Sequence, residues 1–239
     1  MRANSSIILS TAIFEVPGLP LPVQLRRMQT ARIMRLRVDH GKRLLKLTAP
    51  ARTTPRQALH WAEQQRHWVD AQLAEAPPLR SFADGATIPL SGRDVTIRWL
   101  GGRRGVRLDQ DKLLVGGPQD SLGRSLSRWL QDEARRALSA ETARIAAAAG
   151  VTVRRVSIGD PASRWGSCSS SGNIRYSWRL ILAPPECLRF VVAHEVAHRL
   201  HMNHGPEFKR LEAELFGGPV TGVRHLLRRW SPVLRAVGG

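Results

Sequence analysis

The chain has 239 residues, of which 42% are hydrophobic, and this is enough for the core of one domain or of two small ones. No apolar run approaches the roughly 20 residues of a membrane-spanning helix, so no membrane partner is expected. The formal net charge is +18, and almost all of the positive charge is arginine. A basic surface can bind nucleic acid nonspecifically, although an arginine excess can also reflect the codon composition of a GC-rich genome.

The first apolar stretch, residues 7–14, predicts a strand rather than a signal peptide. It is short, polar residues interrupt it, and it lacks a cationic lead-in and a small-residue cleavage site. Without an export signal, we expect a cytoplasmic protein in which Cys168 and Cys187 are reduced thiols rather than a disulfide.

The rest of the first half also has the alternating pattern of strands, with one helix. Apolar side chains alternate with Arg35 and Arg37, which predicts a half-buried strand with one basic face. A turn is expected at 40–41, and a helix capped by Thr54 is expected to run to about residue 74. The predicted strands, including a meander of short strands, cover 34–38, 45–49 and 87–115.

The second half is predicted to be mainly helical. Apolar residues recur on one face of a long segment that Gly150 should end, and Pro184 should precede another helix. The predicted helices cover 121–149, 185–202, 206–216 and 223–236, and the apolar runs between them cover 151–158 and 174–182. The two halves predict an α+β fold, with a β-rich N-terminal region at 1–118 and a second region at 119–239, or one continuous domain.

One helix of the second region carries the pattern His-Glu-x-x-His. On a helix, His194 and His198 stand one turn apart on the same face, about 6 Å between Cβ atoms, so that both imidazoles can bind one metal ion. Glu195 points to an adjacent face, where its carboxylate can reach a metal-bound water without being a ligand. This arrangement is typical of zinc hydrolases and predicts one Zn²⁺ ion per chain, with Glu195 as the general base.

The third ligand has to come from outside this turn, because a catalytic zinc usually takes three protein ligands and one water. We favour His204, since the Gly205–Pro206 pair directly after it lets the chain reverse and can direct the imidazole back to the metal. His201 is the alternative histidine. Glu207 and Glu212 on the following helix are less favoured carboxylate alternatives.

Four segments, in this order along the chain, resemble the YgjP-like metallopeptidases, which are relatives of the SprT- and Wss-type zincins. They are 164–169 (Arg-Trp-Gly-Ser-Cys-Ser), 177–184 (Ser-Trp-Arg-Leu-Ile-Leu-Ala-Pro), 194–198 and 202–208. The resemblance covers about residues 25–235. It implies a zincin-like catalytic region, with the metal helix packed on a small sheet, in which His204 is the third ligand and Glu195 the helix glutamate.

The resemblance also places the segment that begins at Arg164 near the active site, as a wall of the substrate cleft. There Gly166 would let a substrate backbone approach closely, and Ser167 could offer a hydrogen bond. Arg164 could stabilise an oxyanion or form an ordinary ion pair. Trp165 could contact substrate or simply pack in the core beside the metal helix, as could Cys168.

Two further residues are open to more than one interpretation. Asn203, beside the third histidine, could donate to a reaction intermediate, but an exposed turn residue is the default expectation. Tyr176, the only tyrosine, could steady an oxyanion, yet packing is favoured.

The pattern as a whole predicts a zinc-dependent metallopeptidase that cleaves a protein or peptide substrate by attack of a zinc-activated water. A metal-dependent nucleoside triphosphate pyrophosphatase is one alternative, because arginines could hold phosphates. A basic nucleic-acid-binding protein with a structural zinc is the other.

Overall fold

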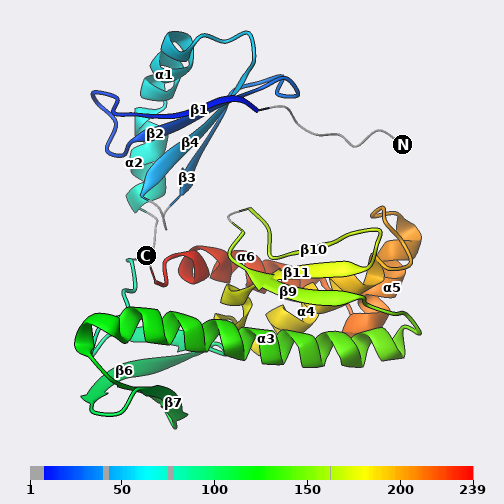
Figure 1. The fold of residues 1–239 in the computed structure, drawn as a ribbon. Helices are drawn as coiled ribbons and strands as arrows, with labels where there is room; N and C mark the ends of the chain where they lie inside the picture. Colours follow the sequence, from blue (N-terminus) through cyan, green and yellow to red (C-terminus); the bar gives the residue numbers. More distant parts are fainter. Residues whose placement is uncertain (1–7, 40–42, 75–77, 162, 239) are drawn as a thin grey trace. The chain divides into compact units, whose positions relative to one another are not determined.

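The structure, a computed structural model, describes residues 8–39, 43–74, 78–161 and 163–238 (Figure 1). Its contacts divide the chain into two compact units, Met1–Leu79 and Arg80–Gly238, with the last residue grouped with the first unit. The fold is mixed α+β, as the sequence predicted, with strands prominent in the first half and helices in the second. The predicted turn at 40–41 and the first residue of the predicted strand at 7–14 lie outside the described residues.

The first unit is a four-stranded sheet with two helices. The sheet order is β1-β2-β4-β3, with parallel pairing only between β2 and β4. A capping box between Thr54 and Gln57 begins the first helix, and Gln65 separates it from the second, where the sequence predicted one continuous helix. The elements are β1 (Ile8–Phe14), β2 (Val23–Met28), β3 (Arg35–Asp39), β4 (Leu44–Pro50), α1 (Pro55–Gln64) and α2 (Arg66–Ala74).

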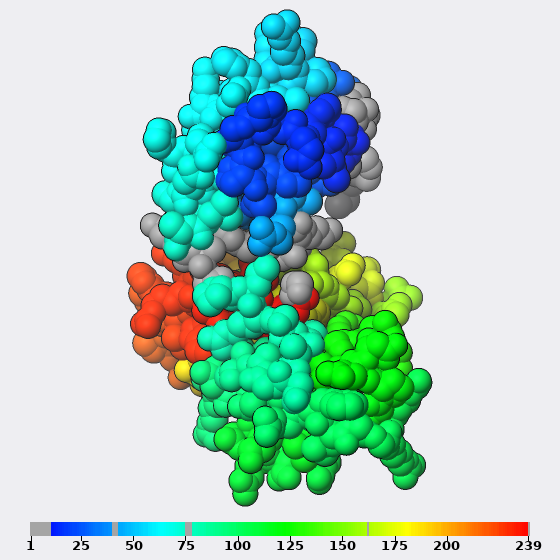
Figure 2. Space-filling model, turned by 90° about the vertical axis from the view of Figure 1, so that its left-hand side faces the viewer, coloured from blue at the N-terminus to red at the C-terminus, as the bar shows by residue number. Residues whose placement is uncertain are grey.

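The two faces of this sheet differ sharply in character. Apolar side chains of β2 and β4 join residues of α1 and α2 in a buried cluster that includes Val23, Leu45 and Ala58. The alternate positions bring Arg26, Arg35 and Arg37 to the other face, where all three are exposed. The segment that contains β1, one of the two edge strands, lies at the surface in Figure 2 (dark blue). Nonspecific binding of nucleic acid through the basic surface of the protein stays a prediction.

The second unit begins with another four-stranded sheet, in the order β5-β6-β8-β7. Val115 of β8 belongs to the same core cluster as Leu122 and Leu126 of the long helix α3. The contacts place this sheet and α3 in one unit and divide the chain after Leu79, whereas the sequence pattern had suggested either a division at residue 118 or one continuous domain. The elements are β5 (Thr87–Leu90), β6 (Arg93–Gly101), β7 (Gly105–Asp109), β8 (Lys112–Gly116), η1 (Gln119–Ser121) and α3 (Leu122–Ala148).

The remaining part of the second unit is a small sheet followed by three helices. The sheet order is β10-β11-β9, so that β10 is an edge strand. In Figure 1, α3 runs along the length of the unit, and α3, α5 and α6 all pack against α4. The elements are β9 (Arg155–Gly159), β10 (Gly166–Cys168), β11 (Asn173–Ser177), η2 (Trp178–Leu182), α4 (Pro185–Ala197), α5 (Pro206–Phe216) and α6 (Thr221–Arg235).

The second half of helix α4 is deeply buried. Its residues from Phe190 to Ala197 are buried except His194, because the helix is enclosed by its neighbours on several sides. It ends at Ala197, with His198 as the capping residue, several residues before the predicted end at 202. The early end leaves residues 199–205 free to turn back along the helix before Pro206 begins α5.

Candidate metal centre

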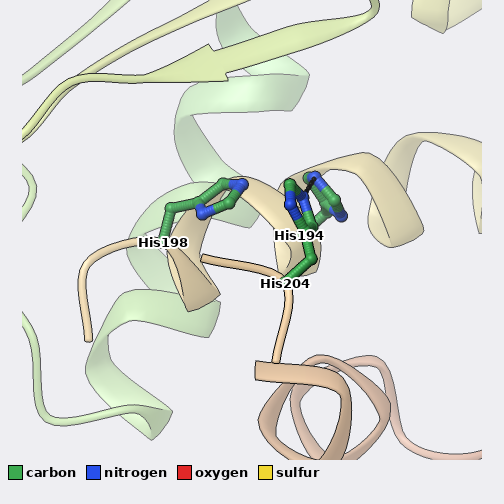
Figure 3. A group of neighbouring side chains, drawn as sticks. All are labelled: His194, His198 and His204. Atoms are coloured by element: carbon green, nitrogen blue, oxygen red, sulfur yellow. Dashed lines mark hydrogen bonds between the residues drawn. The ribbon is translucent and has the colours of Figure 1, made fainter. Parts of the chain in front are cut away.

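Three histidines from two segments meet at the end of α4. His194 and His198 come from the last turn of the helix and its cap, and His204 comes from the loop that leads into α5 (Figure 3). One ring nitrogen of each lies within 4.8 Å of the others. The Nε2 atoms of His194 and His204 are 3.3 Å apart. Three imidazole nitrogens converging on one point form a donor set that suits a transition-metal ion or zinc.

The outward ring nitrogens of the two helical histidines are already engaged. Nδ1 of His194 lies 2.7 Å from Oε1 of Glu212, and Nδ1 of His198 lies 3.1 Å from the carbonyl oxygen of His201. Each acceptor favours the tautomer with its proton on Nδ1, which leaves the Nε2 lone pair for a metal. Burial also lowers the pKa of His198, which favours the neutral imidazole that a metal requires. The residues present therefore fit a bound metal ion.

Glu212 of α5 contacts the side of His194 that faces away from the proposed metal position. Its side chain is fully buried, one carboxylate oxygen accepts from His194, and the other accepts from Arg224 of α6. Burial by itself would raise the pKa of Glu212, but the hydrogen bond from His194 and the charge of Arg224 outweigh it and hold the pKa below its ordinary value. Glu212 therefore stays ionised and orients His194, rather than acting as the ligand that the sequence left open.

The charge and position of Glu212 should matter for metal affinity. We expect Glu212→Gln to weaken zinc binding by about 10- to 100-fold, because the amide accepts more weakly from His194 and no longer neutralises Arg224. The measurement is a zinc competition titration against a chromophoric chelator. Glu207→Gln is the matched control, since Glu207 lies on the same helix but is exposed and pairs with Arg210. Equal zinc affinity of the two variants would contradict this role.

An aromatic ring packs against all three imidazoles. The ring centroid of Phe208 lies 4.6 Å from those of His198 and His204 and 5.0 Å from that of His194. Phe208 is almost fully buried in the first turns of α5, so it limits the rotation of the histidine rings on the protein side. Phe208 is the last residue of the segment 202–208, but no role was predicted for it from the sequence.

Glu195 lies on the side of α4 that faces the small sheet. It is 4% exposed, and α4 contacts β10. Burial raises the pKa of Glu195 to about 7, although the charges of His194 and Arg164 and the backbone N–H of Cys168 act in the opposite direction. A carboxylate with a pKa near neutrality can both accept and return a proton, as a general base must.

The segment expected to form the cleft wall divides into two groups. Gly166 and Cys168 lie beside Glu195, and the exposed Arg164 is close enough to affect its charge. Trp165 instead packs on the main core, with the guanidinium of Arg235 4.6 Å above its ring. Ser167 is half-buried in β10 between the two residues beside Glu195.

Two other residues lie apart from this group. Asn203 is exposed on the loop before His204. Tyr176 is fully buried, with its hydroxyl 3.1 Å from Oγ1 of Thr142, and burial raises its pKa well above the ordinary value. Tyr176 is therefore a core residue, as the packing interpretation predicted.

An α+β unit that gathers three imidazoles beside a buried carboxylate has the construction of a metallohydrolase domain. Residues 32–228 match the family model described as YgjP-like, metallopeptidase domain. The chain therefore belongs to the YgjP-like metallopeptidase family, which confirms the resemblance read from its motifs. Searches among curated proteins and among solved structures gave no match. No helix in the described ranges combines the length and the apolar character needed to cross a membrane.

Proposed function

We propose that the protein is a zinc-dependent metallopeptidase that hydrolyses peptide bonds in protein or peptide substrates. The observation that carries this proposal is the convergence of His194, His198 and His204 within reach of one ion, next to the buried Glu195 of α4. Family membership supports the peptidase activity. The three histidines would hold the ion, and a bound zinc would supply a water whose pKa is lowered toward 7 and a Lewis acid for the substrate carbonyl.

The protein's own residues would have separate tasks in this reaction. Glu195 would accept the proton of the attacking water at its carboxylate and return it to the leaving amine. Glu212 and the carbonyl of His201 would hold the two helical imidazoles in place throughout. Of the five residues predicted to face the substrate (Arg164, Trp165, Gly166, Ser167 and Asn203), Trp165 packs on the core and Gly166 adjoins Glu195, so Arg164, Ser167 and Asn203 are the ones proposed for this role. The exposed Arg164 would interact with a developing negative charge.

The donor set favours this proposal over its alternatives. Triphosphate hydrolysis usually relies on magnesium, which prefers oxygen ligands, whereas this cluster offers three nitrogens. A structural zinc site is closed by four protein ligands, whereas a three-ligand site leaves one position for water. A cytoplasmic location, and reduced thiols at Cys168 and Cys187, stay predictions.

The test measures metal content and turnover on the same purified samples. We expect near-stoichiometric zinc, cleavage of casein, and loss of that cleavage on chelation with recovery on adding zinc. Nucleoside triphosphate is the parallel substrate. Triphosphate turnover without peptide cleavage would overturn the peptidase proposal, and strong nucleic-acid binding without metal-dependent hydrolysis of either substrate would favour the structural-zinc alternative.

A further inference from the structure

The edge strand β10 lies directly against the carboxylate of Glu195. A Cβ atom added to Gly166 would stand 2.5 Å from Oε1, 2.6 Å from Cγ and 2.8 Å from Cδ of Glu195. Non-bonded atoms in a packed interior do not approach this closely, because optimal carbon contacts are about 3.5–4.0 Å. Gly166 is not among the glycines with a positive φ, so its backbone conformation is open to any residue. The contact with Glu195, rather than the backbone, is what requires glycine here.

A second part of β10 also contacts the same carboxylate. The backbone N–H of Cys168 is near enough to Glu195 to lower the pKa of its carboxylate, against the larger effect of burial. Gly166 and Cys168 are two residues apart on β10, so the same short strand supplies both groups beside Glu195. The geometric contact is made by Gly166, which leaves the space that the carboxylate occupies.

The strand that makes these contacts is itself held in place. Gly166 pairs with Tyr176 of β11, and Cys168 pairs with Ile174. Both partners on β11 are fully buried. The backbone N–H of Ser177 also donates to the carbonyl of Trp165, just before β10, at 2.8 Å. Pairing with the buried strand β11 therefore fixes the position of β10.

We propose that β10 is a cradle that sets the position of the catalytic carboxylate, with Gly166 as the positioning residue. This inference rests on the proposed role of Glu195 as general base. An alanine at position 166 would displace the carboxylate, or β10, from its present place. A misplacement of about 1 Å in a catalytic group can lower the rate about 100-fold.

The first experiment measures whether Gly166 acts through Glu195, without any use of activity. The urea unfolding midpoints of the metal-free protein are compared for Gly166→Ala, Glu195→Ala and the double variant. We expect Gly166→Ala to lower the midpoint in the wild-type background. In the Glu195→Ala background the same change should have almost no effect, because Cγ, Cδ and Oε1 of Glu195 are absent there.

Two features keep this experiment decisive. Gly159→Ala in β9 is the matched control, since an added Cβ there meets the guanidinium of Arg175, a flexible end that can move away. Its effect should be small and equal in both backgrounds. If Gly166→Ala does not fold alone, recovery of folding in the double variant supports the cradle. The cradle would be overturned if Gly166→Ala shifted the midpoint equally in both backgrounds, or if neither Gly166→Ala nor the double variant folded.

The second experiment separates positioning from substrate contact. We expect Gly166→Ala to lower kcat by about 100-fold on a peptide substrate, with KM and zinc content unchanged. A raised KM with unchanged kcat would instead identify Gly166 as a substrate contact and overturn the cradle. Failure of the proposed role of Glu195 would give a different result. The Glu195→Gln variant would then cleave peptide at the full rate, while the unfolding comparison would still report contact between β10 and Glu195.

Discussion

Replacing Glu195 with glutamine is expected to lower kcat for peptide cleavage by about 10³-fold or more, with zinc content unchanged. The amide is nearly isosteric, so it fills the same buried space beside Gly166, but it cannot accept the proton of the attacking water. General-base catalysis typically contributes 10²- to 10⁴-fold, which sets the scale of the loss.

The measurement pairs single-substrate kinetics with metal analysis of the same preparation. Glu186→Gln is the matched control, because Glu186 is exposed in the first turn of the same helix, about two turns before His194. That variant should retain wild-type kcat. Retention of activity by Glu195→Gln would remove this residue from the chemistry, and loss of zinc would show a structural role for its carboxylate instead.

Local patterns predicted many of the elements of the fold because they depend on neighbours in the sequence. Alternation identified β3 and β4, and Thr54 does cap α1. No glycine or proline lies at the break between α1 and α2 at Gln65, so the sequence predicted one continuous helix. The division after Leu79 depends on β8 packing against α3, a contact between segments that local periodicity does not report.

In the candidate site, too, local patterns predicted what depends on neighbouring residues but not the contacts between distant ones. The spacing of His194 and His198 follows from helix geometry and was readable from five residues. The roles of Glu212 and Gly166 depend on contacts across 18 and 29 positions of the chain, respectively. Gly166 was expected to allow close approach of a substrate backbone, whereas the close approach in the structure is made by Glu195. The sequence indicated that Gly166 allows a close approach, but it did not indicate which group approaches.

The sequence left two histidines, His204 and His201, as candidates for the third metal ligand, and a pair of variants can decide between them. We expect His204→Ala to weaken zinc binding by more than about 100-fold, a larger loss than that for Glu212→Gln, because a direct ligand is removed rather than the partner of one. Zinc stoichiometry after dialysis and competition with a chromophoric chelator provide the measurement. Peptide cleavage should fall in parallel and recover only partly in excess zinc.

His201→Ala is the matched control for this variant, since His201 was the competing histidine. Its backbone carbonyl accepts from Nδ1 of His198, and truncation of the side chain leaves that carbonyl in place. The imidazole of His201 is not among the three ring systems whose nitrogens converge. Zinc affinity should therefore be close to that of the wild type. The reverse result, with stoichiometric zinc in His204→Ala and a loss in His201→Ala, would move the third ligand to the earlier histidine and require the loop before α5 to rearrange when the metal binds.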